Sequence, residues 1–351
     1  MAHQIANNPT GVVHMGTWRG KSWVIYNTIV EKYCRTLVLC HNIQTANDIY
    51  AGIITNIDWL RPDQVSNINS TTNMCPSGVI DVFTHSGFTR SYSTLGEYDM
   101  ILYDECDYNL SFPVRQDYHC MIWWLIQMDT PYLYGFTWTP YRAEGGAEVL
   151  NRIFWHIWTW ENAEYNFIPT ITQVHAQYHG DYDFETFAEL MQSLATNEDR
   201  TDEQLDLYNK HKRKRNLILV KTIEESKKFN NLIPNSILLN GELGKKELEW
   251  ALWNIHTAID TNSGFTLVGT IDKLGRGVDI PPIDTIFLFS PVKFRGTVVQ
   301  AVGRWLRKYP GKTDVMLYDW CDLPILKKQQ KERLTCYEQE YWIKDFNFIK
   351  L

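Results

Sequence analysis

Short apolar runs separated by longer amphipathic stretches repeat along the first 140 residues of the chain. Runs of this length between helix-like segments are typical of a parallel sheet covered by helices. We predict strands at residues 12–14, 36–39, 79–83, 100–103 and 132–136. The first part of the chain is therefore expected to be an α/β unit.

The same rhythm returns in the second part of the chain. Strands are predicted at residues 217–220, 237–239, 266–268, 285–289 and 315–318, with helices at 224–231 and 247–259. No short-period repeat is visible, so the pattern indicates two similar units rather than a solenoid. The lysine-rich stretch after Asp322 predicts a C-terminal helix that packs back on the second unit.

A segment rich in charge and turn formers separates the two sets of strands. It contains an acidic stretch at 197–203 and the basic run from Lys212 to Arg215. The basic run is interpreted as a solvated linker, with contact to phosphates as the alternative. We predict an N-terminal unit at 1–179, a charged insert or linker at 180–215 and a C-terminal unit at 216–351.

Composition limits the class of protein. With 351 residues and 44% hydrophobic content, the chain can bury two cores. A net charge of −7 excludes a uniformly basic surface but leaves room for a local basic groove. The seven cysteines form no metal-ligand spacing, which predicts a reduced, cytoplasmic protein without structural zinc. No signal peptide or membrane-spanning run is expected.

The first motif with a chemical role is a loop between a predicted strand and a predicted helix. From Gly16 to Ser22 it reads Gly-Thr-Trp-Arg-Gly-Lys-Ser. Backbone amides before a helix bind anions, a lysine here suits the β- and γ-phosphates of a nucleotide, and the following hydroxyl suits Mg²⁺. We therefore assign Lys21 to the phosphates and Ser22 to the metal.

The second motif is a predicted strand that ends in adjacent carboxylates, at residues 101–107. One carboxylate in this position can hold Mg²⁺ while its neighbour orients and deprotonates the attacking water. Asp104 is the candidate metal ligand and Glu105 the candidate general base. The alternative is an acidic surface turn, which the phosphate loop upstream makes less favoured.

A third motif of this kind lies in the second unit, where Gln300, Arg304 and Arg307 recur at helical spacing. A polar face of this type indicates contact with anions. An arginine delivered to a γ-phosphate stabilises the charge of the transition state, so Arg304 and Arg307 are candidates for that role. An exposed helix with surface ion pairs is the alternative.

The ordered set of motifs resembles superfamily 2 helicases. It comprises Gly-Thr-x-x-Gly-Lys-Ser, Asp-Glu-Cys-Asp, Gly-Phe-Thr-x-Thr-Pro at 135–140, Gly-Arg-Gly-Val-Asp-Ile-Pro at 275–281, and Gln-x-x-Gly-Arg-x-x-Arg at 300–307. The set spans residues 12–322. The stretch 137–145 and the Asp-Glu-Cys-Asp box are most similar to the type III restriction, phage branch-migration and transcription-repair helicases.

The resemblance implies an α/β fold of two RecA-like lobes, with ATP and Mg²⁺ in the cleft between them and single-stranded nucleic acid across both. It assigns the nucleotide to Gly16, Thr17, Gly20, Lys21, Ser22, Gly277 and Asp279. It places Gln300 beside Glu105, Arg304 and Arg307 in catalysis. Contact with nucleic acid, or coupling to it, is assigned to Asn42, Thr84, His85, Thr137, Thr139 and Thr270. From the residues alone, His41 and His85 are ordinary polar residues at strand ends rather than catalytic bases.

The chain departs from the family pattern at two tryptophans. Trp18 stands where the family has Gly, and Trp138 stands where it has Ala. In a left-handed backbone a non-glycine residue costs about 1–2 kcal/mol. One expectation is therefore weakened or lost hydrolysis, and the other is a loop that binds through its remaining amides with Trp18 directed outward. Trp305 is expected to face the core.

Three functions remain open at this point. The leading hypothesis is an ATP-dependent DNA helicase or translocase in a phage-like setting, acting on single-stranded or branched DNA. A catalytically silent helicase fold that binds nucleic acid or a protein is the alternative that the tryptophans favour. An RNA-directed ATPase of the same fold is the third.

Overall fold

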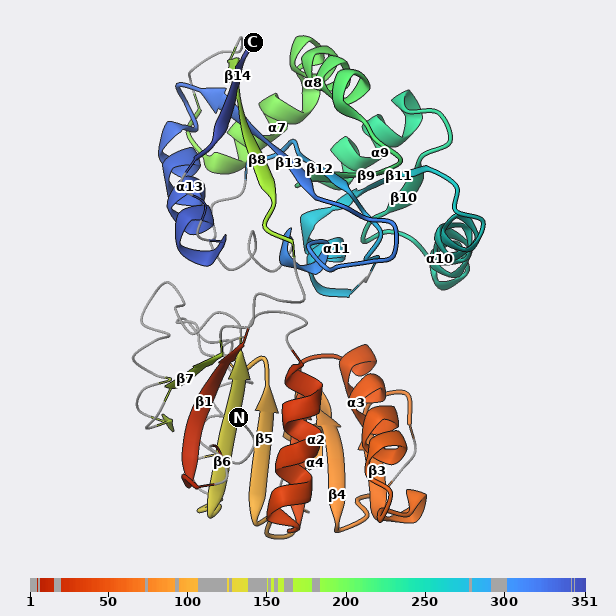
Figure 1. The fold of residues 1–351 in the computed structure, drawn as a ribbon, viewed down its shortest axis with the longest axis vertical. Helices are drawn as coiled ribbons and strands as arrows, with labels where there is room; N and C mark the ends of the chain where they lie inside the picture. The colour runs from red at the N-terminus through yellow and green to blue at the C-terminus, as the bar shows by residue number, and fades with distance from the viewer. Residues whose placement is uncertain are drawn as a thin grey trace. The chain divides into compact units, whose positions relative to one another are not determined.

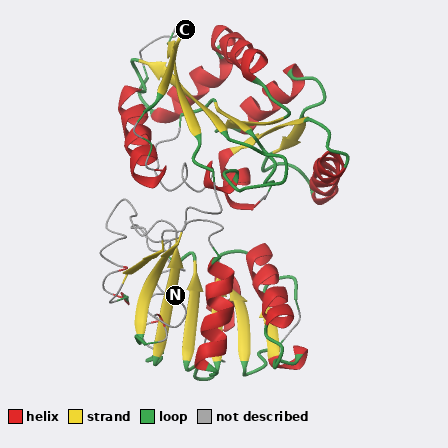
Figure 2. Ribbon diagram, viewed as in Figure 1, coloured by secondary structure: helices red, strands yellow, loops and turns green. Residues whose placement is uncertain are grey.

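A computed structural model describes residues 5, 7–15, 20–72, 75–91, 95–106, 125, 128–137, 150, 153–154, 157–160, 167–178, 184–277, 280–291, 302–341, 343 and 345–351. The chain divides into two units, Met1–Asn162 and Ala163–Leu351, each built around one sheet (Figure 1). Helices flank the sheet of each unit (Figure 2). The predicted α/β class with two similar units is confirmed.

The first unit holds a seven-stranded sheet of order β3-β4-β2-β5-β6-β1-β7, in which every described pair is parallel. The strands are β1 (Thr10–Met15), β2 (Thr36–Cys40), β3 (Val65–Ile68), β4 (Ile80–Thr84), β5 (Met100–Asp104), β6 (Tyr132–Thr137) and β7 (Ile157–Trp160). The helices between them are α2 (Lys21–Lys32), α3 (Ile43–Asn56), the 3₁₀ turn η1 (Pro62–Gln64) and α4 (His85–Ser91).

Both faces of this sheet are buried, which explains why its strands are continuous apolar runs. Successive strand residues point to opposite sides. Val38 joins the cluster that α2 and α3 cover, whereas Leu37 and Leu39 join the cluster around Phe88 of α4. The sheet is therefore the middle layer of three.

The second unit holds a parallel sheet of order β10-β11-β9-β12-β13-β8-β14. Its strands are β8 (Thr170–Gln177), β9 (Arg215–Val220), β10 (Ile237–Leu239), β11 (Phe265–Thr270), β12 (Thr285–Leu288), β13 (Met316–Leu323) and β14 (Asn347–Lys350). Its helices are α7 (Phe187–Thr196), α8 (Glu198–His211), α9 (Ile223–Leu232), α10 (Lys245–Asp260), α11 (Ile271–Gly277) and α13 (Lys327–Tyr341). The predicted C-terminal helix is α13.

The boundary predicted near residue 180 lies later in the chain than the observed division. Residues 170–177 form β8, which pairs with β13 inside the second sheet. The predicted charged insert contains α7 and α8. The acidic stretch is the start of α8, where the Asn197 side chain accepts a hydrogen bond from the Arg200 amide and Glu198 and Asp199 lie in the first turn. Acids are favourable at that position because of the helix dipole.

The basic run is part of the second unit rather than a linker, whereas Lys212, Arg213 and Lys214 are exposed to solvent as predicted. Arg213 pairs with Asp314 at 2.6 Å, and Lys214 donates to the Asn262 side chain at 2.9 Å. Arg215 is the first residue of β9 and is buried. These side chains stabilise their own unit.

Candidate functional site

The helix α2 begins at Lys21, directly after a residue with unusual backbone geometry. Gly20 has φ +89°, a left-handed conformation that glycine adopts without strain. The Lys21 ammonium is thereby fixed at the N-terminus of α2, on the side reached by the carboxyl end of β1. The sequence prediction of a strand, loop and helix around this lysine is confirmed for the described residues on both sides of the loop.

Two carboxylates at the end of β5 meet this ammonium. The Lys21 Nζ lies 3.2 Å from Asp104 Oδ1 and also donates a hydrogen bond to Glu105 Oε1. All three side chains are largely buried. Burial opposes the charge of Lys21, but the two carboxylates outweigh it and raise the pKa of the lysine. Burial raises the pKa of Asp104, and Lys21 counteracts that shift.

Glu105 has a strained backbone, with φ +50°. Such a conformation is uncommon for a residue with a side chain and is found preferentially at functional sites. The next residue, Cys106, donates its amide to the Phe136 carbonyl of the neighbouring strand β6 at 3.1 Å. The turn that carries Glu105 is therefore held to the sheet immediately after the strained residue.

Gly135 makes room for this turn. A Cβ atom at Gly135 would lie 2.7 Å from the Cys106 sulfur and 2.9 Å from the Phe154 ring. Gly135 is paired with Tyr103 across the β5 and β6 ladder. The glycine of the Gly-Phe-Thr motif is therefore required by the packing of the residue that follows Glu105.

Ser22 has a partner that sequence reasoning did not identify. Burial raises the pKa of Tyr26, one turn further along α2, and the nearby Ser22 side chain counteracts that shift. The Tyr26 ring lies against Gly52 of α3, where a Cβ atom would be 1.9 Å from the hydroxyl. The helical spacing of Ser22 and Tyr26 was a possible signal, but the facing glycine could not be read from the sequence.

Those predicted residues of the first unit that the structure describes lie at one edge of the sheet. Because its strands are parallel, their carboxyl ends meet at this edge, which is where open α/β sheets bind ligands. Lys21 follows β1 and Glu105 follows β5. Asn42 follows β2, Thr84 ends β4 and Thr137 ends β6.

Of the described residues assigned to nucleic acid in this unit, Thr84, His85 and Thr137 are buried and Asn42 is partly buried. The Asn42 side chain caps α3 by accepting from the Thr45 amide at 2.8 Å. Thr84 accepts from the Gly87 amide at 3.2 Å, and both Thr84 and Thr137 are buried. His85 is 4% exposed and its ring meets Tyr103 edge-on, so burial lowers the pKa of this histidine to about 3, with a further contribution from His41. His85 is therefore neutral near pH 7.

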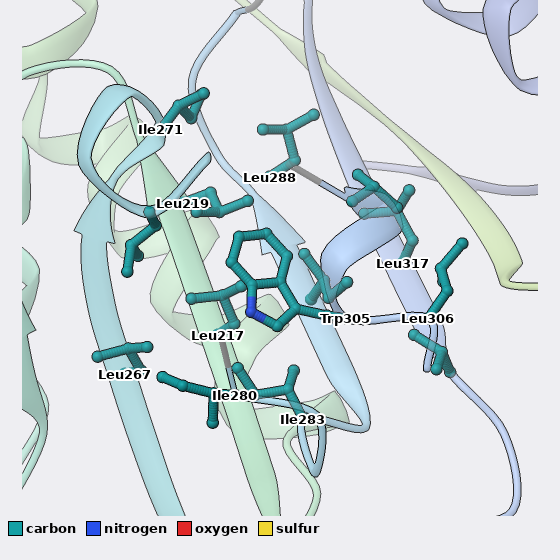
Figure 3. Close-up of a cluster of buried hydrophobic side chains, with 14 of the residues drawn as sticks. Leu217, Leu219, Leu267, Ile271, Ile280, Ile283, Leu288, Trp305, Leu306 and Leu317 are labelled. Carbon is teal, nitrogen blue, oxygen red and sulfur yellow. The ribbon is translucent and has the colours of Figure 1, made fainter. Parts of the chain in front are cut away.

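The second unit places Arg304 and Arg307 on either side of a buried anchor. Trp305 is 0% exposed and lies among Leu217, Ile280 and other apolar residues (Figure 3). The prediction that Trp305 faces the core is confirmed. Arg304 and Arg307 are each partly exposed. Thr270 ends β11 and is buried, and Gly277 is the last residue of α11.

Several predicted residues lie outside the described part of the chain. They are Gly16, Thr17, Trp18, Trp138, Thr139, Asp279 and Gln300. Their assignments stay predictions.

The chemistry of the described donors fits a nucleotide with Mg²⁺. Ser22, Asp104 and Glu105 offer oxygen atoms, which are the ligands that Mg²⁺ prefers. Lys21 offers a cation at a helix N-terminus, which suits phosphate. Within the described residues, no helix has both the length and the apolarity needed to cross a membrane.

Comparison with known proteins also indicates a helicase domain in this chain. The family model of the helicase conserved C-terminal domain matches residues 199–309. No curated protein sequence matches the chain.

Solved structures match nearly the whole chain. S. cerevisiae Dbp5 bound to RNA and ADP BeF3 is 13% identical, with a TM-score of 0.65 over 99% of this chain and 87% of that one. A fragment of a putative HsdR subunit of a type I restriction enzyme from Vibrio vulnificus YJ016 is 15% identical, with a TM-score of 0.70 over 98% and 64%. The ATP-dependent Type ISP restriction-modification enzyme LlaBIII bound to DNA is 14% identical, with a TM-score of 0.70 over 99% and 30%.

The chain is therefore a helicase-fold protein with two RecA-like units. Residues 199–309 of the second unit match the helicase conserved C-terminal domain, in agreement with the helicase resemblance of the motifs in that unit.

Proposed function

We propose that the chain is an ATP-dependent helicase or translocase that couples ATP hydrolysis to movement along nucleic acid. The observation that carries this proposal is the cluster of Lys21, Asp104 and Glu105 at the strand-end edge of the first unit. A buried lysine held by two carboxylates at a helix N-terminus is suited to exchange those carboxylates for phosphate oxygens. An acidic surface turn would place no buried cation there.

The residues of this cluster divide the chemistry between them. Lys21 and the amides around Gly16, Thr17 and Gly20 bind the phosphates. Ser22 and Asp104 would hold Mg²⁺, which would neutralise phosphate charge when bound. Glu105 accepts the proton of a water whose oxygen attacks the γ-phosphorus, while the bond from that phosphorus to the bridging oxygen breaks and ADP leaves.

The second unit contributes to the same reaction. Arg304 and Arg307 stabilise the charge of the transition state, with Gln300 beside them and Gly277 and Asp279 at the nucleotide. Partial exposure of both arginines on either side of the Trp305 anchor supports this role. Arg304→Ala is expected to abolish turnover while nucleotide affinity changes little, and an equal loss of both would contradict the role.

The buried threonines and His85 act as couplers rather than as direct contacts. Thr84, Thr137 and Thr270 each end a strand and are buried, so a nucleic acid strand would reach their backbone before their side chains. His85 is neutral and cannot attract phosphate by charge. We propose the same coupling role for Asn42 and Thr139.

We favour DNA as the polymer, in single-stranded or branched form. The support is the likeness of residues 137–145 and of the Asp-Glu-Cys-Asp box to restriction and branch-migration helicases. The structural relatives include proteins bound to RNA and to DNA, so the fold alone does not separate the two.

The test is phosphate release from ATP and Mg²⁺ with single-stranded DNA, single-stranded RNA or no polymer. Lys21→Ala serves as the inactive control. We expect turnover above that control and stimulation by DNA. Stimulation by RNA alone would identify an RNA-directed ATPase.

Trp18 and Trp138 favour a second candidate, a silent helicase fold that binds nucleic acid or a protein partner. Absence of turnover above the Lys21→Ala control with every polymer, together with retained polymer binding, would support it instead. Restoring the family pattern with Trp18→Gly would then be expected to raise nucleotide affinity.

A further inference from the structure

A partly buried lysine outside the predicted motifs joins two of them within the second unit. The Lys312 Nζ donates a hydrogen bond to the Trp305 carbonyl at 2.5 Å and another to the Pro281 carbonyl at 2.9 Å. Trp305 lies between the two candidate arginines, and Pro281 ends the Gly-Arg-Gly-Val-Asp-Ile-Pro motif. One ammonium therefore binds the backbone of both motifs.

A second hydrogen bond holds the segment between Arg304 and Arg307. The Phe167 amide donates to the Leu306 carbonyl at 2.6 Å, and the Lys312 ammonium lies 5.7 Å from the centre of the Phe167 ring. The adjacent carbonyls of Trp305 and Leu306 are thus bound by two groups, one from Lys312 nearby in the chain and one from Phe167, which is distant in the chain. The segment between the candidate arginines is fixed by backbone hydrogen bonds on its polar side.

The indole of Trp305 fixes the opposite side of the segment. It is fully buried in the cluster that contains Ile280 and Ile283 (Figure 3). These two isoleucines flank Pro281 and Pro282 in the chain. The same two motifs therefore meet twice, once through apolar packing and once through Lys312. Apolar attraction has no preferred direction, whereas hydrogen bonds with a preferred geometry help to define the register of a segment.

We propose that Lys312 is a positioning residue that fixes the Arg304 and Arg307 segment against the segment ending at Pro281. The effect on catalysis rests on the proposed function of the arginines. Lys312 does not touch the nucleotide in this role. It holds in place the backbone from which the arginines extend, and small displacements of such groups are costly for turnover.

The acceptors explain why a lysine is needed. A carbonyl that loses its donor in a buried place pays the full cost of its desolvation. Lys312→Met keeps the length and the apolar stem of the side chain but removes both donors. Lys312→Arg keeps donors that can reach two carbonyls. Lys308 lies in the same connection and is exposed, so Lys308→Met is the matched control.

The experiment has a kinetic arm with the full chain. Lys312→Met is expected to lower kcat by about 10- to 100-fold, the range for misplaced catalytic groups, while KM for ATP changes by less than about threefold. Lys312→Arg is expected to recover most of kcat, and Lys308→Met to match the wild type. An unchanged kcat in Lys312→Met, or an equal rise in KM, would overturn the catalytic part of the proposal.

Hydrogen exchange provides an arm that needs no turnover. The amides of Trp305 and Leu306 donate to the carbonyls of Val302 and Gly303. In Lys312→Met we expect these amides to exchange about tenfold faster, while the amides of β9 keep wild-type rates. Equal acceleration throughout the unit would mean a merely structural role and would overturn the proposal. If the wild type shows no ATPase, the proposed function fails, and this arm still decides whether Lys312 fixes the segment.

Discussion

Glu105 accepts a hydrogen bond from the Lys21 ammonium, although 84 residues separate them in the chain. The contact arises because both residues follow carboxyl ends of parallel strands in one sheet, β1 and β5. It joins the proposed phosphate ligand to the proposed general base. Lys21 also lies 3.2 Å from Asp104, so one cation faces both acids.

The first prediction concerns Glu105 itself. Glu105→Gln keeps the shape of the side chain but removes the base, so turnover is expected to fall by about 10²- to 10⁴-fold, with nucleotide affinity largely retained. Glu105→Gly and Glu105→Ala both lose the contact with Lys21 and are expected to lose turnover equally, but the glycine variant is expected to be more stable than the alanine variant by about 1 kcal/mol, because φ +50° costs glycine little. Urea titration measures this difference. A glycine variant no more stable than the alanine variant would show that the backbone carries no strain.

The second prediction concerns Gly135. Gly135→Ala is expected to destabilise the chain by about 1–3 kcal/mol, because the added Cβ overlaps the Cys106 sulfur. Cys106→Ala in the same chain is expected to recover part of the loss, which a double-mutant cycle in urea measures. Gly241→Ala is the matched control, since nothing lies within 4 Å of a Cβ there. Simple additivity of the two substitutions would contradict the overlap.

The apolar strands could be predicted from the sequence because both faces of each sheet are buried. The strand β8 could not, because it is not a continuous apolar run: polar residues occupy five of its eight positions. One of them, Gln173, is buried against specific partners: its side-chain nitrogen donates to Asp319 at 2.9 Å and its side-chain oxygen accepts from Gln330 at 2.8 Å. Partners on other elements are known only from the fold.

The residues of the candidate site also divide into those that the sequence predicts and those that it does not. Lys21, Asp104 and Glu105 could be predicted because strand, motif and strand-end position agree in the sequence. Lys312 could not, because its partners are backbone carbonyls, which the sequence does not distinguish from any others. The charged insert was misjudged for a related reason. The Arg200 side chain is buried against Asp322, at 2.8 Å, in a stretch whose composition is that of a surface.

The third prediction concerns the attachment of α13. Arg333 lies on this helix and pairs with Asp319 of β13, and both side chains are buried. Arg333→Met leaves the carboxylate buried without its cation, which is expected to cost about 3–5 kcal/mol. Asp319→Asn in the same chain is expected to recover part of that loss. Chemical denaturation measures both, and a double variant as unstable as the sum of the singles would contradict the pair.

The fourth prediction is a pH dependence that comes from Lys312. Burial lowers the pKa of Lys312 from its ordinary value of 10.5 to about 7, against the opposing effect of the carboxylates of Asp284 and Asp314. Between these two values the unfolded chain keeps a proton that the folded chain releases, so folding becomes more favourable as pH rises. Below pH 7 both states carry the proton and the contribution is constant.

The free energy of unfolding of the wild type relative to Lys312→Met is therefore expected to rise from pH 7 to pH 9, by at most about 1.4 kcal/mol per pH unit. Urea titrations at several pH values measure the difference, which removes the titration of all other groups. The curve of Lys308→Met should run parallel to that of the wild type, because that side chain is exposed. Parallel curves for Lys312→Met as well would show that the amine keeps its ordinary pKa and is not desolvated between the two motifs.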